Sequence, residues 1–156
     1  MKIAVCVKYV PVVSRIQFDY EQKTIMREGV PSEVNPFDLL GVTCAVNAKS
    51  SPEDEVSIIS MGPPQAREGI LECLALGADK GTILTARALA GSDTLATAMA
   101  LASALRLDPA DLIICGSNSS YAETGQVGPE LAELLDIPHI SPVSYTHLTL
   151  PTNREV

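Results

Sequence analysis

The sequence predicts an α/β protein with a mostly parallel sheet and flanking helices. Short apolar segments alternate with longer amphipathic ones along the chain, which is the order that βαβ units produce. Of the 156 residues, 46% are hydrophobic but only 4% are aromatic, and Trp is absent. This composition suits a sheet built from Val, Ile, Leu and Ala. We therefore expect one domain whose strands are joined by right-handed crossovers.

The first expected strand is followed by an excursion before the first helix. Lys2–Val10 is an apolar segment that Pro11 ends. Phe18–Tyr20 and Thr24–Arg27 come next, separated by polar residues. They suggest either a small hairpin or an irregular segment.

The first helix is expected to begin at the sequence Asn-Pro-Phe-Asp. Asn35 can cap it, Pro36 suits the first turn, and Asp38 lies near the positive end of the helix dipole. Its predicted apolar stripe consists of Phe37, Leu40, Cys44, Ala45 and Ala48.

The next two strands are Glu55–Met61 and Gly81–Thr85. Between them, the turn Gly62-Pro63-Pro64 leads into a helix that reaches about Leu76 and that Gly77 terminates. The expected buried face of this helix comprises Ile70, Cys73 and Leu74.

A third helix is capped by Ser92 or Asp93 and ends near Arg106. It is rich in Ala and apolar on most faces, so we expect it to pack tightly on the sheet. Asp111–Cys115 is the fourth strand, and a fourth helix begins after Thr124.

The charge pattern makes nucleic acids and anionic membranes poor partner candidates. The formal net charge is −8 and no basic run is present. No segment is long enough to span a membrane.

The cysteines and His139 give no metal-binding pattern. Cys6, Cys44, Cys73 and Cys115 include no CxxC pair, so we expect buried free thiols in a reducing cytoplasm rather than a metal site or a disulfide. His139 has no partner at metal spacing and is expected to be structural or exposed.

The segment Asp111–Leu135 is the best candidate for binding. An apolar run ends in Gly116, a polar loop follows, and an amphipathic helix begins. This order places free backbone N–H groups and a positive helix end at the carboxyl end of a strand, where open α/β sheets bind nucleotide phosphates. The loop lacks both the GxGxxG and the GxxxxGKS/T spacing, so motif alone does not name the ligand. Gly116 could also simply end the strand.

The last residues have a different origin in our interpretation. Val143–Thr152, VSYTHLTLPT, matches the translation of a transposase-end adaptor used in sequencing libraries. We expect residues 1–141 to be a truncated nucleotide-binding domain and 142–156 to be translated adaptor. Tyr145 and His147 then have no functional role, and the sheet is incomplete at the C-terminus.

Six segments resemble, in order and spacing, the β subunit of electron transfer flavoproteins. They are MKIAVCVKYVP, REGVPSEVNPFD, SMGPPQA, ALGADKGTILT, AGSDTLATA and DLIICG…TGQVGPELAELLDIPHIS, and the resemblance runs from Met1 to about Ser141. NPFDLLG and GQVGPELAELLDIPHI are similar to the electron-bifurcating branch and to subunits that serve acyl-CoA reductases.

The resemblance implies a fold, a cofactor and partners. The fold would have the Rossmann-like topology of adenine-nucleotide α-hydrolases. The chain would pair with an FAD-containing α subunit, and would hold AMP in an ordinary member or a second FAD in a bifurcating one. It would pass electrons from NADH or an acyl-CoA dehydrogenase to an acceptor such as ferredoxin. It would be an electron carrier rather than an enzyme by itself, or part of a bifurcating acyl-CoA reductase complex.

The resemblance also implies a cofactor site with no catalytic side chain and no metal, since the flavin performs the redox chemistry. The cofactor-binding residues carried over by motif are Cys6, Asn35, Pro36, Phe37, Asp38, Met61, Gly116, Ser117, Asn118, Ser119, Ser120, Tyr121, Ala122, Glu123, Thr124, Gly125, Gln126 and Val127.

Simpler roles remain open for several of these residues. Cys6 could belong to the core, with only its backbone near a ligand, and Asn35 is expected to cap a helix in either case. Asp38 is a dipole partner first, and Glu123 could be a solvated charge. We expect Glu130 to be an ordinary charge on a solvated helix face.

The loop departs from the family pattern. Family loops often have GKQAIDGDTAQVGPE where this chain has GSNSSYAETGQVGPE. Ser117 replaces a lysine, and Tyr121 and Glu123 replace aspartates. Backbone contacts to phosphate survive such changes, so nucleotide binding remains the expectation.

Two other hypotheses remain at this level. The chain could be a stand-alone adenine-nucleotide-binding regulatory module of the universal-stress-protein type. Alternatively, these 156 residues alone could be a fragment that binds nucleotide weakly and exposes apolar surface.

Overall fold

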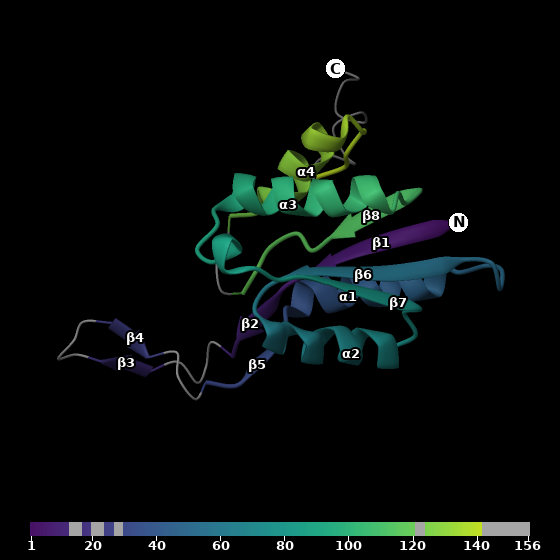
Figure 1. Cartoon of the computed structure of the whole chain (residues 1–156). Helices are drawn as coiled ribbons and strands as arrows, with labels where there is room; N and C mark the ends of the chain where they lie inside the picture. The colour runs from purple at the N-terminus through teal and green to yellow at the C-terminus, as the bar shows by residue number, and fades with distance from the viewer. Residues whose placement is uncertain (13–16, 20–23, 27–29, 121–123, 142–156) are drawn as a thin grey trace, which may run out of the picture.

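A four-stranded parallel sheet forms the centre of the molecule (Figure 1). The computed structural model describes residues 1–12, 17–19, 24–26, 30–120 and 124–141. The strands are β1 (Lys2–Val7), β6 (Glu55–Met61), β7 (Lys80–Leu84) and β8 (Leu112–Cys115), in the order β7-β6-β1-β8. Each neighbouring pair is parallel, as predicted.

Helices cover both faces of the sheet (Figure 1). α1 (Pro36–Ala48) and α2 (Arg67–Ala75) lie on one face, and α3 (Thr94–Leu107) and α4 (Val127–Leu135) lie on the other. Side chains alternate along β1, so one core contains Ile3, Val5 and Val7, and the other contains Ala4 and Cys6. The α/β prediction is confirmed.

The first predicted strand is too long. The strand stops at Val7, and Tyr9–Pro11 forms a separate strand, β2, antiparallel to β5 (Ser32–Val34). The break falls at Lys8, whose N–H bonds to the side chain of Asp38 rather than to the sheet.

The predicted hairpin is present as β3 (Gln17–Asp19) and β4 (Thr24–Met26), which pair antiparallel and lie at one end, away from the main sheet (Figure 1). Of the residues predicted for these two strands, Tyr20 and Arg27 lie outside the described residues.

The predicted apolar stripe of α1 is wrong except at Ala45. The face buried against the sheet consists of Asp38, Gly41, Val42 and Ala45. The other four predicted members, Phe37, Leu40, Cys44 and Ala48, are exposed. The buried face includes a carboxylate and a glycine, which a search for apolar residues does not select, so hydrophobicity pointed to the wrong face.

The helix boundaries elsewhere are close to those predicted. A short 3₁₀ turn, η2 (Pro64–Ala66), precedes α2, and a second, η3 (Arg87–Leu89), precedes α3. Gly77 has a φ of 112°, which explains why it ends α2. Asp93, rather than Ser92, caps α3 by accepting a hydrogen bond from the N–H of Ala96.

Tight packing of α3 is confirmed on only one side. Ala98, Leu101, Ala102 and Leu105 are buried against the sheet and α4. On the outer side, Leu95, Met99 and Leu107 are exposed.

The cysteine prediction is correct for two of four residues. Cys6 and Cys73 are buried, Cys115 is half-buried, and Cys44 is exposed. His139 is exposed. Within the described ranges, no helix is long and apolar enough to cross a membrane.

Candidate functional site

The candidate site lies where β1 and β8 end side by side. The chain leaves β1 through α1 on one face and returns to β8 through α3 on the other, so these two neighbouring strands form the switch point of the sheet. Cys6 and Cys115 are register partners at the carboxyl ends of the two strands. Open α/β sheets bind ligands in the crevice outside such a point.

Asp38 ties the ends of these two strands together. Its side chain is 5% exposed, and Oδ2 accepts a hydrogen bond of 2.8 Å from the N–H of Lys8, just past β1. It also accepts from the N–H of Gly116, just past β8. Burial raises the pKa of Asp38 to about 6, although these N–H donors and the side chain of Asn35 oppose the rise. The Asp38 carboxylate therefore links the ends of β1 and β8. This structural role goes beyond that of the dipole partner predicted from the sequence.

Gly116 is required by the closeness of Asp38. A Cβ on residue 116 would overlap Oδ1 of Asp38. The sequence offered strand termination or nucleotide contact as reasons for this glycine, and the structure adds a third reason. The main chain can approach the carboxylate only without a side chain.

Asn35 is the N-cap residue of α1, as predicted, but its side chain makes no capping hydrogen bond. Its backbone carbonyl accepts hydrogen bonds from the N–H groups of Asp38 and Leu39. The side chain is 1% exposed and points to the loop after β8 instead. Nδ2 donates to the carbonyl of Asn118 at 2.8 Å, and Oδ1 accepts from the N–H of Ser120 at 3.2 Å. Asn35 therefore clamps this loop to the start of α1.

The loop leads into the N-terminus of α4. The N–H of Ser119 bonds to Oδ1 of Asn118 at 3.0 Å. Gly125 has a φ of 62°, a conformation that favours glycine, immediately before the helix. The first N–H groups of a helix have no acceptor within it, and this end of the dipole is positive. The site thus offers main-chain donors to an anion.

A buried hydroxyl in the loop supports a polar ligand. Oγ of Ser120 is buried and has no hydrogen-bond partner among the residues that the structure describes. Such an atom needs a polar partner, so the residues present fit a ribose or phosphate group near this point.

The remaining predicted residues occupy the rim of the site or lie beyond it. Met61 is half-buried at the end of β6, one residue past the Val7–Ser60 register pair. Pro36 and Phe37 are exposed on the first turn of α1. Ser117, Thr124, Gly125 and Gln126 are exposed, and Val127 is half-buried. Tyr121, Ala122 and Glu123 lie outside the described residues.

Lys8 and Cys115 are neighbours of the site that the sequence did not single out. Adjacency of β1 and β8 aligns Cys6 with Cys115, and the first turn of α1 places Asp38 at the N–H of Lys8. Glu130 is a further correction, since it is half-buried and accepts a hydrogen bond from Thr94 at 3.0 Å. It is not an ordinary solvated charge.

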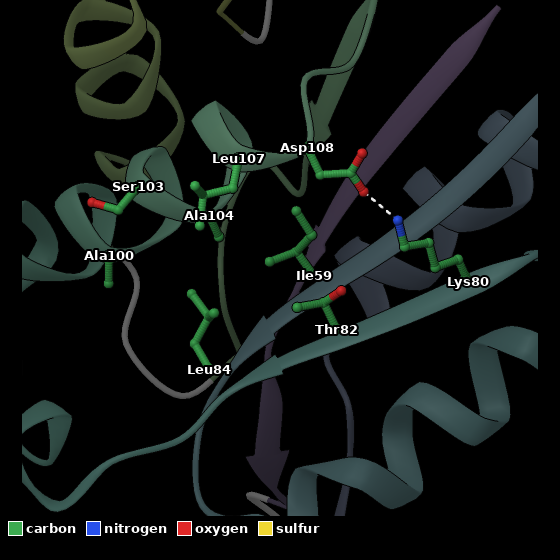
Figure 2. Close-up of a pocket in the computed structure, with 9 residues that line it drawn as sticks. All are labelled: Ile59, Lys80, Thr82, Leu84, Ala100, Ser103, Ala104, Leu107 and Asp108. Carbon is green, nitrogen blue, oxygen red and sulfur yellow. Dashed lines mark hydrogen bonds and ion pairs between the residues drawn. The ribbon is translucent and has the colours of Figure 1, made fainter.

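A hollow of about 600 Å³ lies between α3 and the β6–β7 side of the sheet (Figure 2). Figure 2 shows Leu84, Ile59 and Leu107 around it, with Lys80 paired to Asp108 at one end. Lys2 also pairs with Asp108, and these two lysines lower the pKa of that carboxyl. None of the predicted site residues lines this hollow, so it is distinct from the candidate site at the ends of β1 and β8.

Comparison with known proteins identifies related sequences. Residues 22–149 match the family described as "Electron transfer flavoprotein domain". The electron transfer flavoprotein subunit beta of Thermoanaerobacterium thermosaccharolyticum is 43% identical over 141 residues, which cover 90% of this chain and 54% of that protein.

Two further relatives have more specific names. Protein FixA of Bradyrhizobium diazoefficiens is 40% identical, covering 90% of this chain and 50% of that protein. The caffeyl-CoA reductase-Etf complex subunit CarD of Acetobacterium woodii is also 40% identical, covering 90% of this chain and 55% of that protein. The chain spans about half the length of the relatives it matches.

Proposed function

The chain belongs to the electron transfer flavoprotein domain family, and on that basis we propose that it is the nucleotide-binding part of a β subunit that carries electrons together with an α subunit. The observation that supports this most is the arrangement of polar contacts at the switch point. There Asn35 and Asp38 hold the loop after β8 beside the N-terminus of α4. This is the arrangement in which α/β sheets bind the phosphates of nucleotides.

The bound group is an adenine nucleotide, either AMP or the adenylate half of FAD. The phosphates would lie against the main chain of residues 116–120 and the start of α4, and the Ser120 hydroxyl would gain a polar partner. Ser117 stands where family loops often have a lysine, so binding would depend more on main-chain N–H groups. When bound, FAD would supply the redox chemistry, and the chain would position it.

The relatives suggest the surrounding partners. CarD is named as a subunit of a caffeyl-CoA reductase-Etf complex. By analogy, the proposed partners are an α subunit, an acyl-CoA dehydrogenase or reductase, NADH as donor and ferredoxin as acceptor. A cytoplasmic location belongs to the same proposal. The alternative of a stand-alone regulatory module finds no support in these relatives.

The test is the nucleotide content of the whole protein purified with its α subunit. Acid release followed by chromatography distinguishes AMP plus one FAD per heterodimer, the ordinary type, from two FAD, the bifurcating type. A heterodimer with flavin in the α subunit but neither AMP nor FAD in this chain would contradict the nucleotide site.

A matched pair of variants on α1 locates the site. Asn35→Ala removes the clamp on the loop and is expected to reduce the nucleotide retained by the β subunit at least tenfold. Asn47→Ala changes an exposed asparagine on the same helix, and the amount of nucleotide retained should stay unchanged. Equal retention in both variants would exclude the loop after β8 as the binding element.

A further inference from the structure

Two free cysteines face each other across the switch point. Cys6 and Cys115 are direct register partners on the neighbouring parallel strands β1 and β8. Both belong to the core on the α3 and α4 side of the sheet, so their side chains project from the same face. The two thiols are close enough for each to shift the pKa of the other.

The spacing of neighbouring strands suits a covalent bond between these two residues. Strands in a sheet lie about 4.7–4.9 Å apart. A disulfide needs Cα atoms about 4.4–6.8 Å apart. Register partners on adjacent strands therefore satisfy the requirement on the distance between their Cα atoms.

We propose that Cys6 and Cys115 are a redox-active dithiol that a hydroperoxide oxidises to a disulfide joining the carboxyl ends of β1 and β8. Nothing in this pairing requires a bound nucleotide. The proposal is thus independent of the function proposed above, although the bond would form at the same strand ends.

The environment assigns different roles to the two sulfurs. Cys115 is half-buried, and its Sγ lies 4.0 Å from where a Cβ on Gly128 would be, in the first turn of α4. The neighbouring Cys6 thiol lowers the pKa of Cys115, whereas burial and Asp38 act in the opposite direction. The pKa of Cys6 is raised, first because of its interaction with Cys115 and then because of burial. Cys115 is therefore the attacking residue and Cys6 the resolving one.

The reaction takes two balanced steps. The Cys115 thiolate attacks one oxygen of hydrogen peroxide, the O–O bond breaks, and a sulfenic acid and hydroxide form. The Cys6 sulfur then attacks the Cys115 sulfur, the S–O bond breaks, and water leaves with the thiol proton. Overall, two thiols and one peroxide give one disulfide and two waters, and an added dithiol reverses the oxidation.

Peptide mapping of the whole protein tests this proposal. The four cysteines fall into four different tryptic peptides, at residues 3–8, 28–49, 68–80 and one that begins at Leu107. After treatment with low hydrogen peroxide and alkylation under denaturing, non-reducing conditions, we expect peptide 3–8 to be linked to the peptide that begins at Leu107. Dithiothreitol before alkylation should abolish the link.

The other cysteines are internal controls. Cys44 is exposed but has no expected disulfide partner, so Cys44→Ala should leave the yield of linked peptide unchanged. Cys115→Ala and Cys6→Ala should each remove it, with Cys6→Ala retaining a sulfenic acid that dimedone traps at Cys115. If peroxide oxidises Cys44 while Cys6 and Cys115 stay fully alkylatable in the wild type, the proposal is overturned, whatever the folding of the variants.

Discussion

The carboxylate of Asp38 occupies the space that a side chain on residue 116 would need, so Gly116 and Asp38 are matched to each other. The N–H of Gly116 donates to this carboxylate. The contact joins the start of α1 to the end of β8, two elements that are far apart in the sequence.

Substituting Gly116 should destabilise the protein. In Gly116→Ala the new methyl group displaces the Asp38 carboxylate from its N–H donors, and overpacking of this kind costs about 1–3 kcal/mol. Gly128→Ala is the matched control, because its Cβ would make an ordinary contact of 3.5 Å with Cβ of Cys115. Urea unfolding should separate the two variants, and equal midpoints would contradict the contact.

The stability of the protein should rise as the pH falls from 7 to 5. The pKa of Asp38 is about 6 in the folded state against an ordinary value of 3.8, so the folded state takes up a proton first. Stability therefore decreases as the pH rises through this window, by about 1 kcal/mol between pH 5 and 7 at 1.36 kcal/mol per pKa unit. Asp79 and Asp108 have lowered pKa values, so their contribution to stability decreases as the pH falls. That decrease occurs only below about pH 4, outside this window.

Asp38→Asn is the control for that pH dependence. The amide cannot titrate, so the free energy of unfolding should become flat between pH 5 and 7. It should also be lower at pH 5, because the amide nitrogen cannot accept the N–H of Lys8 or Gly116. A slope that persists in this variant would assign the titration to another group.

Substitutions of Cys73 and Cys44 should reduce stability by different amounts, because Cys73 is buried and Cys44 is exposed. Cys73 is 0% exposed, and burial raises the pKa of its thiol to about 11. Cys73→Ser places an unpaired hydroxyl in the core between the sheet and α2, at a cost of about 1–3 kcal/mol. Cys44→Ser changes an exposed side chain and should stay within about 0.5 kcal/mol of the wild type. Thermal unfolding would show whether this order holds.

A pair of alanine variants tests which residue caps α3. Asp93→Ala removes an acceptor that lies 2.8 Å from the N–H of Ala96 and should cost about 1 kcal/mol. Ser92→Ala removes only a bond from its hydroxyl to the carbonyl of Leu89, so we expect a smaller loss. If Ser92→Ala proved the more damaging, Asp93 would not be the effective cap in solution.

The elements with strong apolar runs were predictable from the sequence, and the polar contacts between them were not. The apolar segment of β6 gave its bounds, Glu55–Met61, without error. The side chain of Asn35 was assigned to a cap because local rules consider only neighbouring N–H groups. Its partners, Asn118 and Ser120, become available only when β1 and β8 are adjacent. The prediction of the buried face of α1 failed for a similar reason, because Asp38 is buried by contacts with the ends of β1 and β8.

The clamp by Asn35 engages only peptide groups, namely the carbonyl of Asn118 and the N–H of Ser120. Every amino acid supplies a carbonyl at position 118, and every amino acid except proline supplies an N–H at position 120. Mutations that change the side chains of this loop can therefore accumulate without loosening its attachment. An ancestor with this scaffold could exchange one ligand for another by altering loop side chains alone, while Asn35 and Gly116 stayed fixed.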